Sequence, residues 1–152
     1  MKITDVLKKE SIILSLKSRK KDQIIKELTD NLAPSQSDFN KSIAYETIME
    51  REKLCSTALD AGVAIPHGKM SGINNFLTVF GRSTEGVDFE SLDGKPTYLF
   101  FLILSPDNSS GLHLKLLAKI SKIFKIPEFR ENILKAKNVD EIYELISEQD
   151  DE

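Results

Sequence analysis

Two apolar runs in the middle of the chain give the clearest structural signal. Residues 76–80 and 97–104 are rich in aromatic and aliphatic side chains. The first run is followed by the turn-forming stretch 81–86, and the second is preceded by the turn-forming stretch 93–96. Each run therefore predicts a β-strand. The second run is apolar at almost every position, which is typical of a central strand covered by helices on both faces.

Helical periodicity dominates the rest of the chain. Residues 20–32 place Ile24, Ile25, Leu28 and Leu32 on one face, which predicts an amphipathic helix that ends before Pro34. A second helix is expected to run to about residue 53, with Ser37 or Asp38 as its N-cap. The other expected elements are a helical turn at 3–7, an edge strand at 11–16 and helices at 110–124, 128–136 and 139–148.

These elements predict an α/β fold in which a central mixed sheet is flanked by helices. A length of 152 residues suits one domain, and folding should bury roughly two-thirds of the unfolded surface. We expect the domain to span residues 1–148. The acidic tail 149–152 is expected to be a frayed end.

Composition and charge exclude several classes of protein. Hydrophobic residues make up 40% and charged residues 30% of the chain, as in ordinary globular proteins. The net charge of −3 leaves no extended positive surface for nucleic acid. No apolar run approaches the roughly 18 residues of a membrane span, and the N-terminus lacks the apolar core of a signal peptide. A single cysteine, Cys55, forms no internal disulfide, so the sequence favours a reducing, cytoplasmic setting.

The most informative stretch is residues 63–68, because its residue types restrict the backbone around one imidazole. Pro66 forces Ile65 into an extended conformation and cannot donate to a strand ladder, so His67 should stand at a strand end. Gly68 leaves room for another backbone or a phosphoryl group to approach the ring. With an ordinary pKa near 6.5, a histidine keeps a nucleophilic nitrogen near neutral pH and suits a phosphoryl carrier. Taken alone, a histidine in a turn is more often structural or incidental.

His113 and Arg51 are the other two candidate site residues. His113 lies in the first turn of a helix that Ser109 or Ser110 could cap, and it shares a face with Leu117 and Ile120, so it should point inward. The positive end of a helix favours a neutral imidazole and a bound anion. A core histidine is the alternative. Arg51 could clamp a phosphoryl group or a partner's carboxylate from a helix end, or it could pair with a neighbouring glutamate.

Four further residues between Cys55 and Asp60 bear on the chemistry. Ser56 and Thr57 could donate to phosphate oxygens or to the backbone. Cys55 has no base beside it and is interpreted as a small buried residue. A metal-dependent hydrolase built on His67, His113 and Asp60 is a third, weaker hypothesis, because these residues do not form a recognisable ligand set.

Residues 50–69, with the core Ala-Ile-Pro-His-Gly and Arg51-Glu52 sixteen residues before His67, resemble the signature region of type 2 enzyme IIA domains. These domains belong to the bacterial phosphoenolpyruvate-dependent sugar phosphotransferase system. The resemblance continues through residues 93–96, the strand ending in Ser105-Pro106, the His113-Leu114 pair and residues 140–143. It covers nearly the whole chain and is strongest for the free-standing nitrogen-regulatory members.

The resemblance implies that His67 accepts a phosphoryl group from the phosphocarrier HPr and passes it to an enzyme IIB domain. His113 would orient or stabilise the group, and Arg51 would line the site. It also implies a sheet of about five strands and no metal or organic cofactor. The alternative role is a regulatory protein-binding module switched by phosphorylation of His67. Cys55, Ala58, Asp60 and Ala61 depart from the family pattern, and Asp60 is expected to face solvent because an inward carboxylate would repel a phosphoryl group.

Overall fold

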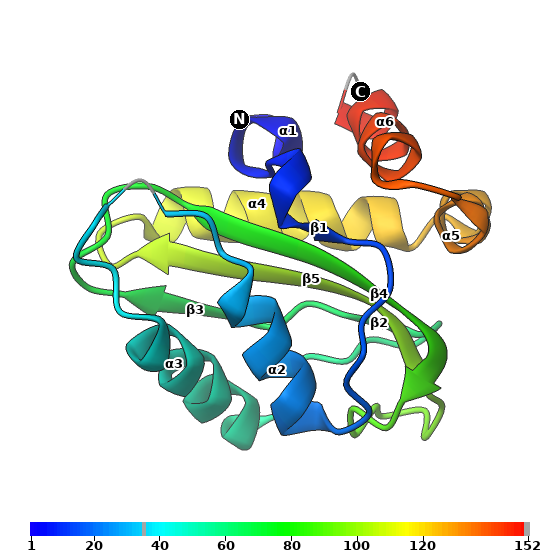
Figure 1. The fold of residues 1–152 in the computed structure, drawn as a ribbon, viewed down its shortest axis with the longest axis horizontal. Helices are drawn as coiled ribbons and strands as arrows, with labels where there is room; N and C mark the ends of the chain where they lie inside the picture. The colour runs from blue at the N-terminus through cyan, green and yellow to red at the C-terminus, as the bar shows by residue number, and fades with distance from the viewer. Residues whose placement is uncertain (35, 151–152) are drawn as a thin grey trace.

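The computed structural model describes residues 1–34 and 36–150 as one α/β domain with three layers (Figure 1). A mixed sheet lies between two groups of helices, as the sequence predicted. The helices are α1 (Ile3–Val6), α2 (Lys21–Asp30), α3 (Lys41–Leu54), α4 (Ser110–Phe124), α5 (Pro127–Lys135) and α6 (Val139–Asp150), with a short 3₁₀ helix η1 (Lys9–Ser11). The strands are β1 (Ile12–Ile13), β2 (Val63–Ala64), β3 (His67–Met70), β4 (Leu77–Val87) and β5 (Thr97–Pro106).

The sheet has the order β1-β4-β5-β2, with β3 also paired to β5. The β4–β5 pair is antiparallel, whereas β1 runs parallel to β4, and β2 and β3 run parallel to β5. The five strands of the described chain confirm the predicted mixed sheet. Its central strand is β5, which the apolar pattern of residues 97–104 indicated.

The strands β2 and β3 form one edge of the sheet, interrupted at Pro66. Val63 pairs with Leu99 and His67 pairs with Ile103, so the register against β5 is the same before and after the interruption. Pro66 has no N–H to donate, but its carbonyl accepts a hydrogen bond from the Ile103 N–H at 2.9 Å. This is an arrangement that proline tolerates at a sheet edge. His67 is therefore the first residue of β3.

Alternate residues of β5 face two separate apolar cores, which explains its continuous hydrophobicity. Phe101 and Ile103 pack with α1, α4, α5 and α6 on one face of the sheet. Phe100 and Leu102 pack with α2 and α3 on the other face. Figure 1 shows α2 and α3 side by side on their face of the sheet, and α1 beside α6 on the opposite side. The described residues contain no helix with the length and apolar character required to cross a bilayer.

Several predicted boundaries were wrong. The strand β4 continues through residues 81–86, which were expected to form a turn. The side chain of Asn40, rather than of Ser37 or Asp38, caps α3 by accepting from the Ile43 N–H at 3.2 Å. The strand expected at 11–16 is only Ile12–Ile13 long.

The end of the chain also differs from the expected frayed tail. The helix α6 continues to Asp150, whose carboxylate is buried. Its two oxygens accept hydrogen bonds from the N–H groups of Ile3 at 2.7 Å and Thr4 at 3.0 Å. The last turn of α6 thus holds the first helix of the chain. Residues 151–152 of the expected tail lie outside the described residues.

Candidate functional site

His67 is half-buried, and a backbone carbonyl fixes its ring. The Nδ1 atom lies 2.7 Å from the carbonyl oxygen of Ile65. Because a carbonyl oxygen can only accept, Nδ1 must bear a proton and donate it. In the neutral ring the lone pair is then on Nε2. The extended Ile65-Pro66 segment thus supplies both the position of His67 and its tautomer.

His113 approaches His67 from the first turn of α4. Its side chain is buried, and its Nδ1 atom lies 2.6 Å from Oγ of Ser105, a fully buried residue near the end of β5. The two imidazole ring centroids are 5.5 Å apart and the ring planes are tilted by 53°. Sequence spacing left open whether the two histidines of the chain meet, and the structure brings them together.

Burial lowers the pKa of both imidazoles below the ordinary histidine value. For His67, loss of hydration is the main cause, and the charge of Arg51 acts in the same direction. The bond to Ile65 and the charge of Glu52 oppose it. For His113, loss of hydration again dominates, followed by the charges of His67 and Lys69. Both rings are therefore mainly neutral near pH 7, as a nucleophilic nitrogen requires.

Arg51 and the two histidines line one shallow groove of about 560 Å³ between α3, β3 and the start of α4. Arg51, in the last turn of α3, donates from Nη1 to the carbonyl of Cys55 at 2.9 Å. Within the described residues it makes no ion pair with Glu50 or Glu52, so the alternative of a surface pair is not realised. The residues lining the groove are Thr47, Glu50, Arg51, Leu54, His67, Gly68, Lys69 and His113.

Lys69 is a groove residue that the sequence interpretation missed. Its Nζ atom donates to Oγ of Ser110, at the start of α4, at 2.6 Å. A signal was present, because residues two apart in a strand point to the same face and Lys69 is two residues after His67. Together with Arg51 and the N-terminal end of α4, Lys69 brings positive charge to the groove, which also contains the carboxylate of Glu50.

Gly68 was expected to leave room beside the His67 ring, and the structure shows which neighbour needs that room. A Cβ atom at this position would lie 3.0 Å from Cγ2 of Thr47 and 3.5 Å from Cδ1 of Ile48. The glycine therefore lets α3 pack closely over β3, beside His67. It is this packing that brings Arg51 to the same groove.

The other polar candidates lie away from the groove. The Ser56 hydroxyl donates to the carbonyl of Phe89 at 2.8 Å, and the Thr57 hydroxyl donates to the Glu52 carboxylate. Asp60 is exposed, as expected, and lines a different hollow together with Lys125 and Arg130. The prediction of a buried Cys55 was wrong, because the residue is exposed.

The ligand set considered for a metal-dependent hydrolase does not assemble. Asp60 and the two histidines line separate hollows. Across residues 1–34 and 36–150, no three histidine, cysteine or carboxylate side chains come close enough to hold a metal ion.

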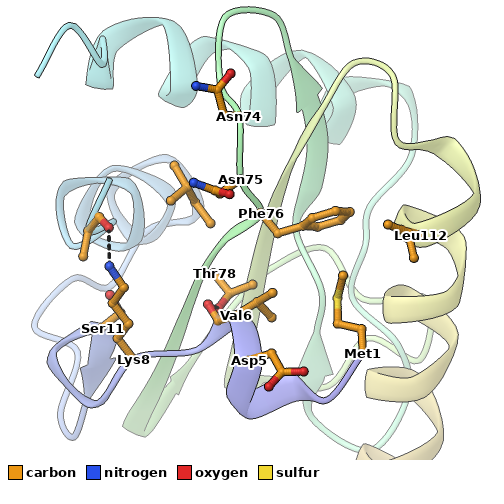
Figure 2. Close-up of a pocket in the computed structure, with 12 residues that line it drawn as sticks. Met1, Asp5, Val6, Lys8, Ser11, Asn74, Asn75, Phe76, Thr78 and Leu112 are labelled. Carbon is orange, nitrogen blue, oxygen red and sulfur yellow. Dashed lines mark hydrogen bonds between the residues drawn. The ribbon is translucent and has the colours of Figure 1, made fainter. Parts of the chain in front are cut away.

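A larger hollow, of about 650 Å³, lies between α1, the start of β4 and the first turn of α4 (Figure 2). Figure 2 shows Phe76 and Leu112 facing each other across it. Its charged side chains already have partners, since Asp5 accepts from the Lys2 N–H at 2.8 Å and Lys8 donates to the Ala33 carbonyl at 3.2 Å. It contains no histidine, so we assign the chemistry to the smaller groove.

Comparison with known proteins gives one consistent result. The family model described as "Phosphoenolpyruvate-dependent sugar phosphotransferase system, EIIA 2" matches residues 5–149. A nitrogen regulatory protein of Bradyrhizobium diazoefficiens is 35% identical over 147 residues, covering 97% of this chain and 95% of the relative. A fructose-specific EIIABC component of Bacillus subtilis is 36% identical over 150 residues, covering 99% of this chain but only 24% of the relative.

Among solved structures, the nitrogen regulatory protein IIA-Ntr of Neisseria meningitidis superposes with a TM-score of 0.89 at 32% identity. The superposition covers 95% of this chain and 98% of the Neisseria chain. The likeness therefore extends over nearly the whole fold described above.

Proposed function

Because this chain belongs to the type 2 EIIA family of the phosphoenolpyruvate-dependent sugar phosphotransferase system, we propose that it carries a phosphoryl group on the Nε2 atom of His67. The observation that carries this proposal is the hydrogen bond between His67 Nδ1 and the Ile65 carbonyl. In this bond Nδ1 bears the ring proton and donates it to the carbonyl oxygen. It leaves the lone pair of the other nitrogen for attack on phosphorus.

In the proposed reaction, the Nε2 lone pair forms a new N–P bond while the bond between phosphorus and the donor atom breaks. The donor atom keeps the electron pair of that bond. The Nδ1 proton stays on the His67 ring, where the Ile65 carbonyl stabilises the positive charge that develops as Nε2 attacks. The return step, transfer to an acceptor, reverses these bond changes.

The remaining groove residues stabilise and orient the phosphoryl oxygens. Arg51 and Lys69 supply positive charge, and His113 lies beside the acceptor ring, held by Ser105. Phosphoryl transfer depends mainly on such positioning and charge stabilisation, so few other groups are needed. We propose HPr as the donor and an enzyme IIB domain as the acceptor, with the reaction located in the cytoplasm.

A partner protein can reach the groove because the groove is shallow and one of its lining residues is an exposed leucine. Leu54, the last residue of α3, is 82% exposed. An exposed leucine beside a polar centre is typical of a protein–protein contact surface. The combination suits a carrier whose donor and acceptor are proteins.

Incubation with phosphoenolpyruvate, enzyme I and HPr tests the proposal. We expect an acid-labile, alkali-stable phosphate on His67, absent from His67→Ala, and a ¹⁵N–³¹P coupling at Nε2. Phosphate found on another residue, or coupling at Nδ1, would contradict the assignment.

We also propose a second role, a regulatory module whose partners depend on the phosphorylation state of His67. The likeness to nitrogen regulatory proteins over nearly their full length favours it. In pull-downs from lysate, the phosphorylated protein should retain a different set of partners from the unphosphorylated protein and from His67→Ala, which cannot be phosphorylated at this position. The same set of partners in all three states would exclude the switch.

A further inference from the structure

The loop before β2 is connected to His67 by consecutive hydrogen bonds. The Glu52 carboxylate accepts from the Thr57 N–H, with its two oxygens 3.1 Å and 3.2 Å from the nitrogen. The Thr57 carbonyl accepts from the Ile65 N–H at 3.1 Å. The Ile65 carbonyl then accepts from His67 Nδ1 at 2.7 Å. Three bonds thus link a residue in the last turn of α3 to the proposed phosphoacceptor.

Glu52 is an unusual residue for this position because it is a buried carboxylate. Its side chain is 2% exposed, whereas an ordinary glutamate in a last helical turn faces solvent. The compensating charge is Lys21 at the start of α2, whose Nζ lies 2.9 Å from Glu52 Oε2 and 4.8 Å from the Phe89 ring centroid. Burying such a pair costs desolvation energy, which replacement by apolar side chains would avoid.

The hairpin formed by residues 57–65 carries the effect of Glu52 to the site. The Leu59 N–H donates to the Val63 carbonyl at 2.6 Å, and Ala58 bridges Ala64. The turn between them has positive φ angles at Ala61 and Gly62, so the two arms are held in one register. Movement of Thr57 would therefore move the Ile65 carbonyl.

We propose that Glu52 is a positioning residue for phosphoryl transfer, which fixes the Ile65 carbonyl through Thr57 and thereby holds His67 with its lone pair on Nε2. This inference rests on the proposed function of His67. The Glu52 carboxylate acts as an acceptor for a backbone N–H, and Lys21 makes its burial tolerable. Arg51 supports the same loop from the neighbouring helical position through the Cys55 carbonyl.

Two double variants form a matched test. Lys21→Met/Glu52→Gln removes both charges but keeps a side-chain oxygen that can accept from the Thr57 N–H. Lys21→Met/Glu52→Leu removes the same charges and the acceptor together. Apolar replacement of a buried ion pair is commonly tolerated, so both variants should fold. Glu46→Ala, which changes an exposed glutamate on the same helix, is the surface control.

The readouts are the His67 tautomer, from ¹⁵N chemical shifts of the unphosphorylated ring, and the kcat and KM of transfer from phosphorylated HPr. The glutamine variant should keep the Nδ1–H tautomer and a transfer rate close to that of the unmodified protein. The leucine variant should show a mixture of tautomers and a kcat about 10-fold to 100-fold lower, with KM unchanged, because small misplacements of a reacting group have effects of this size. Both measurements are made well below each melting temperature.

The inference would be overturned if the two double variants had the same His67 tautomer and the same transfer rate. It would also be overturned if both variants lost the Nδ1–H tautomer and transfer activity to the same extent. In either case the acceptor at position 52 would make no difference. The tautomer comparison needs no phosphorylation. If the unmodified protein accepts no phosphate on His67, the proposed function fails, while the comparison of tautomers still decides whether Glu52 positions the ring.

Discussion

The imidazole rings of His67 and His113 lie 5.5 Å apart, with Nδ1 of each ring turned away to a partner of its own. His67 is held by the Ile65 carbonyl and His113 by the Ser105 hydroxyl. Each ring therefore has only Nε2 left for chemistry in the groove. A centroid separation of 5.5 Å leaves room for a small group on one ring to lie beside the other ring.

The first prediction concerns His113→Ala. If His113 acts on the phosphoryl group, the variant should transfer phosphate about 100-fold more slowly, the usual cost of removing one stabilising group from a reacting centre. The unfolding free energy should fall by about 1–3 kcal/mol, because the buried Ser105 hydroxyl loses its partner. Transfer kinetics and urea denaturation measure the two effects.

Ser105→Ala is the matched control for that experiment. It keeps the His113 ring in the groove but removes the partner of Nδ1, so it should slow transfer less than His113→Ala does. If His113→Ala lost stability while transferring phosphate at the unmodified rate, His113 would be a core residue only.

The second prediction is a pH dependence of stability. The pKa values of His67 and His113 are lowered by burial, so between each lowered value and the ordinary value near 6.5 the unfolded chain binds more protons than the folded one. Stability must then rise with pH in this window. The protein should be most stable above about pH 6.5 and lose stability as the pH falls below it.

Urea denaturation at a series of pH values measures this slope. In His67→Gln/His113→Gln the slope between about pH 5.5 and pH 7 should largely disappear, because the sequence has only these two histidines and histidine is the side chain type whose ordinary pKa lies in this range. The same slope in the double variant would show that the two imidazoles are not its source.

The pattern of apolar residues predicted the fold but not the course of β4. Glycines at positions 81 and 86 indicated a turn, yet a Cβ at Gly81 would lie 2.9 Å from Leu16 Cδ1 and 3.0 Å from Leu28 Cδ2. Position 81 requires a glycine because α2 and the N-terminal segment pack directly against the backbone there. Such a contact between segments distant in sequence has no local signal.

Arg82, in the same stretch, is a charged residue that lies inside the fold. It is buried, and its guanidinium donates to the carbonyls of Leu14, Ile133 and Ala136 at 3.0, 3.0 and 2.7 Å. It thus satisfies acceptors at the end of α5, which a turn residue would not do. Only the folded structure brings these carbonyls together.

For the site, local restrictions on the backbone drew attention to His67 but left a structural role open, and only the resemblance to EIIA domains favoured a phosphoryl carrier. Helical periodicity predicted an inward His113, which is buried in the structure. Glu52 escaped notice because its burial depends on Lys21 and Thr57, which come from two other segments. The groove itself depends on the close approach of α3 to β3. Tertiary contacts of this kind are not encoded by spacing along the chain.

The third prediction tests that close approach. In Gly68→Ala the new methyl group would lie 3.0 Å from Thr47 Cγ2, so Thr47, and with it α3, is expected to move away from β3 by a few tenths of an ångström. The unfolding free energy should fall by about 1–3 kcal/mol, as in other overpacked cores. Transfer should slow as well, because Arg51 moves with α3.

The double variant Thr47→Ser/Gly68→Ala is the diagnostic partner. Serine lacks Cγ2 but keeps the hydroxyl that donates to the Ile43 carbonyl at 2.8 Å. It should restore most of the stability and the transfer rate, so the two substitutions should be non-additive. Additive losses would mean that the clash between positions 47 and 68 is not what makes glycine necessary.

The fourth prediction concerns Asp150, whose side chain is 1% exposed and which joins the two ends of the domain. Its carboxylate accepts from the N–H groups of Ile3 and Thr4 and lies 3.5 Å from Lys119 Nζ. Asp150→Ala leaves these groups without their acceptor, so the unfolding free energy should fall by about 3 kcal/mol. Amide hydrogen exchange at Ile3 and Thr4 should accelerate more than exchange in β5, because α1 loses its attachment first. Glu148→Ala, which changes an exposed residue of the same helix, should alter neither the unfolding free energy nor the hydrogen exchange of α1. If its effects matched those of Asp150→Ala, the cause would be the loss of negative charge from α6 and not the loss of the two backbone hydrogen bonds.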